Sequence, residues 1–220
     1  MKPFRKQEQH FTALRTLLER GVYHAAAPLS MTALITSDPV PYENRATGTM
    51  APLAPGDHWG DLFDCAWVHF TAPLAAAFPP EAALCRQKHW ALLVDLSAEG
   101  LVYNALGEPV QGLTSATSRN EFPLGLWGKR TVELADTIQN GRIDFWADFT
   151  CCDVEGLYRN GGRVKEACTA WVDDLCRDAF YDWQIVQSLF VGLMENGDPY
   201  GEEVGAVLER AAAEIGRAHV

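Results

Sequence analysis

The apolar positions of the first twenty residues repeat with the spacing of an α-helix. Four of them fall on one helical face: Phe4, Phe11, Leu14 and Leu18. Gly21 follows as a helix-stop signal. The pattern therefore predicts a first helix over about residues 3–20.

The middle of the chain, from Ala25 to Cys152, has a different pattern, rich in proline, glycine and short β-forming runs. Six runs are strand candidates: Ser30–Thr36, Ala66–Ala72, Trp90–Leu96, Leu101–Asn104, Arg130–Ala135 and Arg142–Thr150. In "VHFTA" and "RIDFWADF" apolar and polar residues alternate, as a half-buried strand requires. The Asn140-Gly141 dipeptide predicts a tight turn between antiparallel neighbours.

The helical period returns after Cys168. Seven apolar residues form one stripe at spacings of three and four: Val172, Leu175, Ala179, Trp183, Val186, Phe190 and Leu193. Asp173 and Asp174 lie in the first turn of this predicted helix, where carboxylates favour the positive end of the helix dipole. After "ENGDPYGEE" a further helix is expected to begin near Tyr200.

These patterns predict a mainly β fold with flanking helices, the β part an antiparallel sandwich of jelly-roll or galactose-binding-like type. We expect residues 1–24 to form a helix and lead-in, 25–170 the sandwich, and 171–213 a helical connector.

Composition narrows the function classes. The chain has 220 residues, 48% of them hydrophobic, and a formal net charge of −11. This negative charge disfavours binding to nucleic acid or to anionic membranes, because proteins bind both through clustered Lys and Arg. The basic N-terminus lacks the apolar segment of a signal peptide, and no run is long enough to span a membrane. We therefore expect a cytoplasmic protein.

The cysteines and histidines show no metal-binding spacing. The six cysteines are Cys65, Cys85, Cys151, Cys152, Cys168 and Cys176, and the six histidines are His10, His24, His58, His69, His89 and His219. Neither CxxC nor HxH, HxxxH or HExxH occurs, so reduced, buried thiols and scattered imidazoles are expected. The vicinal Cys151–Cys152 pair could bind a thiophilic metal, but small buried side chains are the favoured interpretation.

Two carboxylate pairs could serve glycoside hydrolysis, namely Asp61 with Asp64 and Asp144 with Asp148. The second pair shares one face of a strand, which is also what a solvated face would show. Four tryptophans could instead form a sugar-stacking platform, although packing in a core is the commoner role: Trp59, Trp90, Trp127 and Trp146. With no GxSxG, phosphate-binding loop or dinucleotide motif, we assign no catalytic, cofactor-binding or metal residue.

Several segments, in order, resemble glycoside hydrolase family 38 α-mannosidases of the bacterial and cytosolic type. They are "PGDHWGDLFDCAWVHFTAPL", "EGLVYNALGEPVQGLT", "RIDFWADFTCCDVEGLY" and the helix "DDLCRDAFYDWQIVQSLFVGLME". The similarity is collinear from about Phe4 to Ala213, and the Gly-Glu-Pro-Val-Gln-Gly-Leu run is its most specific part. The chain departs from the family at Cys152-Asp153 and Trp67-Val68, where Cys-Asn and Trp-Phe are expected.

The resemblance implies a parent enzyme that cleaves α-mannosides with retention, through a carboxylate nucleophile, a general acid and a divalent metal, typically zinc. The family's metal motif, of the form HxDxxW, opens a downstream barrel and does not occur in this sequence. The chain itself is therefore expected to need no cofactor. Its expected partner is its own downstream catalytic domain, and whether the chain also forms a homo-oligomer is left open.

The end of the chain invites a separate hypothesis. Glu214–Val220 matches the translation of a common sequencing-library adapter, whose next three bases encode a stop. We expect the native gene to continue from about residue 213 into the catalytic domain. Apolar side chains near Val172–Leu193 would then be exposed in this chain.

Two functions follow. The first is the N-terminal, non-catalytic part of an α-mannosidase, inactive alone. The alternative is a free-standing carbohydrate-binding or accessory sandwich.

Overall fold

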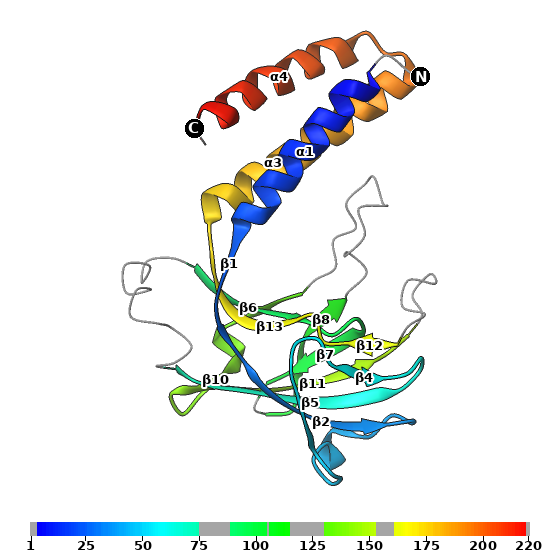
Figure 1. Ribbon diagram of the computed structural model, residues 1–220, viewed down its shortest axis with the longest axis vertical. Helices are drawn as coiled ribbons and strands as arrows, with labels where there is room; N and C mark the ends of the chain where they lie inside the picture. Colours follow the sequence, from blue (N-terminus) through cyan, green and yellow to red (C-terminus); the bar gives the residue numbers. More distant parts are fainter. Residues whose placement is uncertain (1–3, 75–88, 105, 115–129, 153–160, 219–220) are drawn as a thin grey trace. The chain divides into compact units, whose positions relative to one another are not determined.

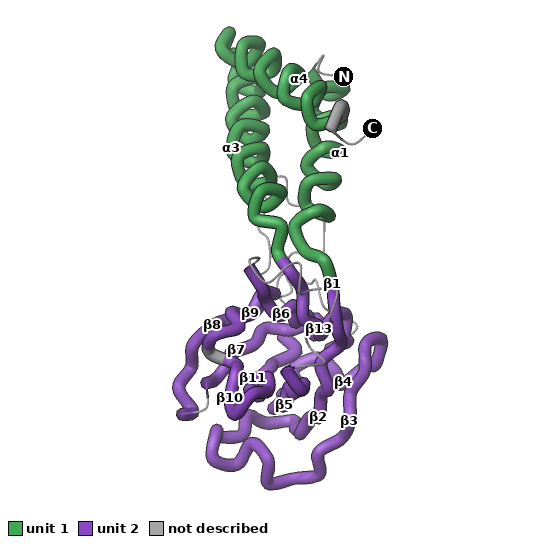
Figure 2. The backbone as a smooth tube through the Cα atoms, turned by 90° about the vertical axis from the view of Figure 1, so that its left-hand side faces the viewer, with its two compact units in different colours: residues 1–24, 172–220 green, residues 25–171 purple. Residues whose placement is uncertain are grey.

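A computed structural model describes residues 4–74, 89–104, 106–114, 130–152 and 161–218 (Figure 1). The chain divides into two compact units, coloured separately in Figure 2. The sandwich unit comprises residues 25–171, and the helical unit comprises residues 1–24 and 172–220.

Antiparallel strands make up the sandwich unit. The strands are β1 (Tyr23–Pro28), β2 (Ser30–Thr36), β3 (Ala51–Leu53), β4 (His58–Gly60), β5 (Cys65–Pro73), β6 (His89–Asp95), β7 (Glu99–Tyr103), β8 (Pro109–Thr114), β9 (Thr131–Glu133), β10 (Ile138–Gln139), β11 (Arg142–Thr150), β12 (Gly162–Arg163) and β13 (Glu166–Val172). One sheet has the order β1-β13-β6-β9, and a larger one has the order β3-β2-β5-β11-β7-β8, with β10 beside β11. Strands β4 and β12 form a separate pair.

The core of this unit lies between the two larger sheets, which form separate layers in Figure 1. Strand β11 illustrates this arrangement. Its residues that point inward are buried, and the residues between them are half-buried. The inward set is Ile143, Phe145, Ala147 and Phe149. Phe145 stacks on Phe70 of β5 with ring centroids 4.8 Å apart, and Leu92 and Val94 of the smaller sheet belong to the same cluster. Each such apolar side chain contributes about 1.5–3 kcal/mol when fully buried.

The mainly β fold class with flanking helices is confirmed. Strands β2 and β11 have the predicted bounds, and β5, β6 and β7 differ from prediction by one or two residues at their ends. The run Arg130–Ala135 is a strand only over β9, because the chain then enters a 3₁₀ turn, η3 (Ala135–Thr137). Short strands such as β3, β4 and β12 have too few residues to show an alternating pattern.

The hairpin predicted from Asn140-Gly141 is present, and a second hairpin lies between Gly100 and Thr114. Asn140 and Gly141 both have positive φ, 49° and 74°, and they join β10 to β11 in antiparallel register. A two-residue turn of this conformation matches the twist of its strands. The segment Gly100–Thr114 forms the antiparallel pair β7–β8. Gly107, with φ of 79°, lies in the turn of that hairpin, where a side chain would collide with the ring of Tyr42.

Three helices build the helical unit: α1 (Arg5–Val22), α3 (Asp174–Asn196) and α4 (Tyr200–Ala218). Phe11 of α1 packs edge-on against Trp183 and Phe190 of α3, at 5.9 and 5.3 Å between ring centroids. The Trp183 Nε1–H donates to the Phe11 carbonyl at 3.0 Å. The first helix thus packs against the helices near the C-terminus, which its own sequence pattern does not show.

Two local expectations for the helical unit are wrong. Helix α1 continues through Gly21 to Val22. Glycine at position 21 allows α1 to pack closely on α3, because a Cβ there would meet the Cys176 Sγ at 2.9 Å. Val172 ends strand β13 and is not part of the helix. Asp173 is the N-cap of α3, and its carboxylate accepts a hydrogen bond from the Cys176 N–H at 3.0 Å.

Helix α4 includes residues 214–218, and their origin stays a prediction. None of the described helices combines the length and the apolar character needed to cross a bilayer.

Candidate functional site

Aromatic and charged side chains gather on the face of the larger sheet that points away from the core. It comprises residues of β5, β7 and β11 and two residues at the 3₁₀ turn η1 (Tyr42–Asn44). We call this the outer-face cluster: Tyr42, Arg45, Trp67, His69, Tyr103, Asp144, Trp146 and Asp148.

Strand register brings the cluster together. Trp146 of β11 lies opposite His69 of β5 and Tyr103 of β7, and Asp148 lies opposite Trp67. The imidazole of His69 stacks on the Trp146 ring, with centroids 4.4 Å apart and planes 4° apart. The His69 Nε2 is 2.7 Å from the Asp144 Oδ1. One face of the sheet thus holds an ordered row of an acid, an imidazole and an indole.

The η1 segment packs against this row. Tyr42 contacts Trp67 and Tyr103, at 5.7 and 5.3 Å between ring centroids. The Trp67 Nε1–H donates to the Val40 carbonyl at 2.7 Å, which ties the segment to β5. The Arg45 guanidinium lies 3.8 Å from the centroid of Tyr42 and 5.0 Å from that of Trp146. Such cation–π contacts stabilise the segment on the sheet.

Asp148 is the group whose ionisation is most perturbed in the cluster. Burial raises the pKa of its carboxyl from 3.8 to about 6, because a low-dielectric environment disfavours the charged form. Its carboxylate has no hydrogen bond or ion pair with another residue that the structure describes. Burial, and then the charge of Asp148, raise the pKa of the Tyr103 hydroxyl.

The two carboxylate pairs do not have the geometry of a glycosidase. Asp144 and Asp148 do share one face of β11, as predicted. Four residues of strand, however, separate them by about 13 Å, whereas glycosidases hold their two carboxyls about 5–9.5 Å apart. In the other pair, the Asp64 Oδ2 accepts the Asp61 N–H at 2.8 Å, so that carboxylate stabilises a turn.

The histidines stay apart. His69 belongs to the outer-face cluster, and His24, His58 and His89 each lie near a different acceptor: the Gly21 carbonyl, Asp61 and Glu133. His10 is on α1, and His219 is outside the described residues. In the described ranges, no three His, Cys, Asp or Glu side chains gather closely enough to hold a metal ion.

The cysteines that the structure describes are free thiols. No disulfide joins the five that lie in the described ranges, and Cys85 falls outside them. Cys151 is buried, as expected of a packing residue, and its N–H donates to the Asp64 carbonyl at 2.9 Å. Burial and the neighbouring Glu166 raise the pKa of Cys168 to about 12, which keeps it a thiol at neutral pH.

The proposed tryptophan platform does not form as one surface. Trp59 is buried, and its Nε1–H donates to the Leu96 carbonyl at 2.8 Å. Trp90 is in β6 of the other sheet, and Trp127 lies outside the described residues. Of the three that the structure describes, only Trp146 is in the outer-face cluster, and part of its ring surface is already used by His69 and Arg45.

Sequence reasoning missed Tyr42, Arg45, Trp67 and Tyr103 as members of one cluster. Their neighbourhood depends on the pairing of β5 and β7 with β11 and on the path of η1. The one available signal was the outward set of β11, where Asp144, Trp146 and Asp148 alternate with core residues.

Comparison with known proteins identifies the sandwich. Residues 27–171 match the model of the family described as "Alpha-mannosidase, jelly roll domain". No individual curated protein matches the chain significantly. The matched segment covers more than half of the chain and coincides closely with the sandwich unit. This chain therefore belongs to the α-mannosidase family and contains its jelly roll domain.

Proposed function

We propose that this chain is the N-terminal, non-catalytic part of a cytoplasmic α-mannosidase that cleaves α-mannosides with retention. The observation that carries the proposal is the family match over residues 27–171. The cleavage itself is assigned to a downstream catalytic domain of the same polypeptide.

The placement of metal-ligating side chains bears on the assignment of catalysis to another domain. An α-mannosidase of this family is expected to use a divalent metal, typically zinc, held by His and Asp side chains. The described part of the chain has no cluster of three such side chains, so its residues do not fit that metal. We therefore derive no catalytic step within this chain.

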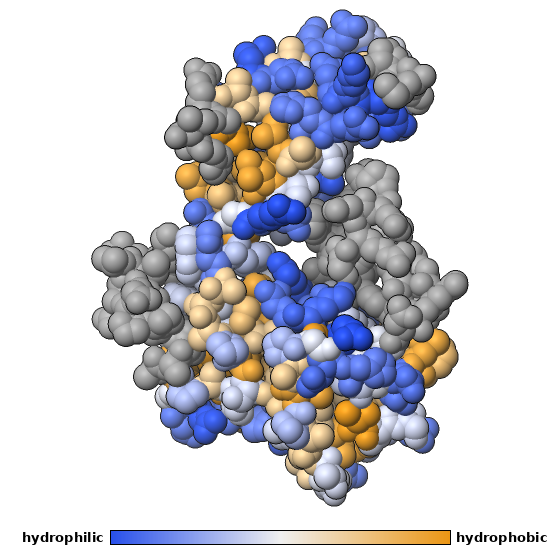
Figure 3. Space-filling view, viewed as in Figure 1, coloured by the Kyte–Doolittle hydropathy of each residue, from blue (hydrophilic) through white to orange (hydrophobic). Residues whose placement is uncertain are grey.

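The helical unit supports the proposal independently. Three aliphatic residues of α3 are exposed: Leu175, Ile185 and Leu189. Orange, apolar residues reach the surface of both units in Figure 3. Exposed apolar side chains near Val172–Leu193 are what we expect if another domain covers this helix.

The proposal is tested by comparing two proteins. The 220-residue chain should not hydrolyse an aryl α-mannoside, and it should not bind one equivalent of zinc. The product of the complete gene, obtained from genomic DNA, should do both and should lose activity when a chelator removes the metal. Sugar release by the 220-residue chain alone, or a complete gene without a catalytic domain, would overturn the proposal.

The outer-face cluster favours a second candidate, a carbohydrate-binding accessory module. Asp148 lies opposite Trp67 in the strand pairing and interacts electrostatically with Tyr103, and its half-buried carboxylate is a group that accepts hydrogen bonds from sugar hydroxyls. Calorimetric titration with methyl α-mannoside should then show saturable binding that Asp148→Ala abolishes. The same substitution at Asp178, an exposed residue of α3, serves as the control.

A further inference from the structure

Asn-Gly dipeptides are places where a protein can modify itself, because the asparagine side chain can react with the nitrogen of the following glycine. The sequence contains three of them: Asn140-Gly141, Asn160-Gly161 and Asn196-Gly197. Asn160 lies outside the described residues. The other two dipeptides consist of the same residues in different surroundings, so their reactivities can be compared within one chain.

The reaction needs no partner except water. The glycine nitrogen loses its proton and attacks the asparagine Cγ, which forms a new C–N bond and closes an imide ring. The bond from Cγ to the side-chain nitrogen breaks, and that nitrogen takes up a proton and leaves as ammonia. Water then opens the imide at either carbonyl and leaves aspartate or isoaspartate. An amide NH₂ is thus exchanged for OH, and nothing is oxidised or reduced.

Both reacting groups of Asn140-Gly141 are accessible. The two residues form the turn between β10 and β11, and both are exposed. Among the residues that the structure describes, neither the Asn140 side chain nor the Gly141 N–H has a hydrogen-bond partner. A Cβ built on Gly141 would meet nothing within 4 Å, so there is open space beside the attacking nitrogen for an imide ring.

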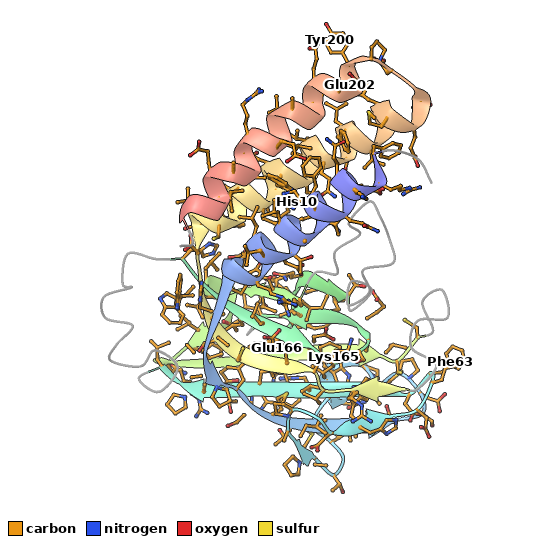
Figure 4. The ribbon with its side chains drawn as sticks, turned by 45° about the horizontal axis from the view of Figure 1, so that its top comes forward. His10, Phe63, Lys165, Glu166, Tyr200 and Glu202 are labelled. Atoms are coloured by element: carbon orange, nitrogen blue, oxygen red, sulfur yellow. The ribbon has the colours of Figure 1, made fainter. Side chains whose placement is uncertain are left out.

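The same groups are engaged at Asn196-Gly197. Helix α3 ends at Asn196, and Gly197 is its C-cap with φ of 69°. The Asn196 Nδ2 donates to the Gly192 carbonyl at 2.8 Å, and the Gly197 N–H donates to carbonyls in the last turn of the helix. This segment lies shortly before α4, whose first residue, Tyr200, is labelled in Figure 4. Reaction at Asn196 therefore has to break contacts that hold the end of α3.

A change at position 140 would affect the hairpin that the turn closes. Isoaspartate continues the main chain through its side chain, so it adds a backbone carbon between Gln139 and Arg142, which are paired across the turn. The Gln139 Nε2 donates to the Asp144 carbonyl at 3.0 Å, and the Arg142 Nε lies 3.9 Å from the Asp144 Oδ2. Since Asp144 also contacts His69, the modified turn would loosen one end of the outer-face cluster.

We propose that Asn140-Gly141 is a site of spontaneous deamidation in the folded protein, where Asn140 is converted to isoaspartate or aspartate while Asn196 is protected. The proposal goes beyond the proposed function and does not depend on a catalytic domain. The reaction adds a negative charge and changes the length of the β10–β11 turn. Aged molecules therefore differ from new ones in charge and at one end of the outer-face cluster.

Incubation of the 220-residue chain in water enriched in heavy oxygen tests the proposal, because the oxygen that opens the imide comes from the solvent. The folded chain and a sample unfolded in guanidinium chloride are incubated side by side at mildly alkaline pH and then digested at acidic pH. Mass spectrometry follows the label at positions 140 and 196, and circular dichroism confirms the state of each sample. Asn140→Gln is the matched variant, since its longer side chain would have to close a larger ring.

In the folded chain, we expect position 140 to take up label about tenfold faster than position 196, because the hydrogen bonds of Asn196 and Gly197 must break first. In guanidinium chloride the two rates should become similar, since both dipeptides are then unfolded. The label at position 140 should disappear in Asn140→Gln. No label at position 140 in the folded chain, label that persists in Asn140→Gln, or uptake at position 140 no faster than at position 196 would overturn the proposal.

Discussion

At the scale of single residues, two aspartates of the same strand have different environments. Asp144 and Asp148 share one strand face, yet among the described residues only Asp144 has a close hydrogen-bond partner, the His69 imidazole at 2.7 Å. Asp148 is half-buried on the strand face that also carries Trp67 and Tyr103, and burial raises the pKa of its carboxyl to about 6. The two acids therefore form an internal pair for comparison.

We predict that Asp148→Asn stabilises the protein at neutral pH. The folded state holds the Asp148 proton up to about pH 6, whereas the unfolded state loses it near its ordinary pKa of 3.8. The native protein thus loses stability as the pH rises through this window. Because the side chain is partly exposed, we reduce the expected gain at pH 7 to about 1 kcal/mol.

Urea unfolding at pH 7 and pH 4 measures this gain, which should shrink toward zero at the lower pH. Asp144→Asn is the control and should give no gain at pH 7, because it weakens the contact with His69. An equal gain for Asp148→Asn at both pH values would show that burial of the charge is not its cause.

Phe63 provides the second prediction at this scale. Phe63→Gly should be more stable than Phe63→Ala by about 1 kcal/mol, because only glycine accepts the φ of 75° without strain. Urea midpoints of the two variants measure the difference. Equal stability would indicate that the turn relaxes once the ring is removed.

At the scale of elements, the structure agrees with the sequence-based prediction where the residues of one element carry the whole signal. Strand β11 alternates over nine residues, and its bounds follow from the sequence. The Asn140-Gly141 turn likewise depends on two adjacent residues. Strand β12 has two residues and pairs with β4, about a hundred positions earlier, so its existence depends on the fold around it.

The same distinction explains the outer-face cluster and the helical unit. The outward face of β11 was predictable, but the approach of Tyr42 and Arg45 depends on the η1 segment, which has no regular period. Gly21 was read as a helix stop because glycine is common there. Its actual reason, the proximity of Cys176, arises only when α1 and α3 pack together.

The N-cap of α3 gives the prediction at this scale. Asp173→Ala should destabilise the protein by about 1 kcal/mol, because the Cys176 N–H loses its acceptor at the helix start. Asp174→Ala is the matched control. It removes a partly exposed ion pair with Arg177, which is worth a few tenths of a kcal/mol. Chemical unfolding followed by circular dichroism compares the two, and equal losses would exclude Asp173 as the effective cap.

At the scale of the whole molecule, the chain combines a sandwich with its own core and a helical unit that leaves apolar side chains exposed. Helix α3 buries Phe180, Trp183 and Phe190 within the helical unit. Leu175, Ile185 and Leu189 lie on the other side of the same helix and remain exposed. Such a surface favours association, since each square ångström of apolar area removed from water contributes about 25 cal/mol.

We predict that the purified 220-residue chain self-associates through this stripe of α3. Replacing Leu175, Ile185 and Leu189 together by Gln should lower the apparent mass measured by light scattering at high concentration. The fold should persist, because all three side chains are exposed and glutamine is a good helix former. Leu106→Gln, an equally exposed change on the sandwich, should leave the association unaltered. A parent chain that is already monomeric at high concentration would show that the stripe needs no cover, and it would remove this support for a second domain packed on α3.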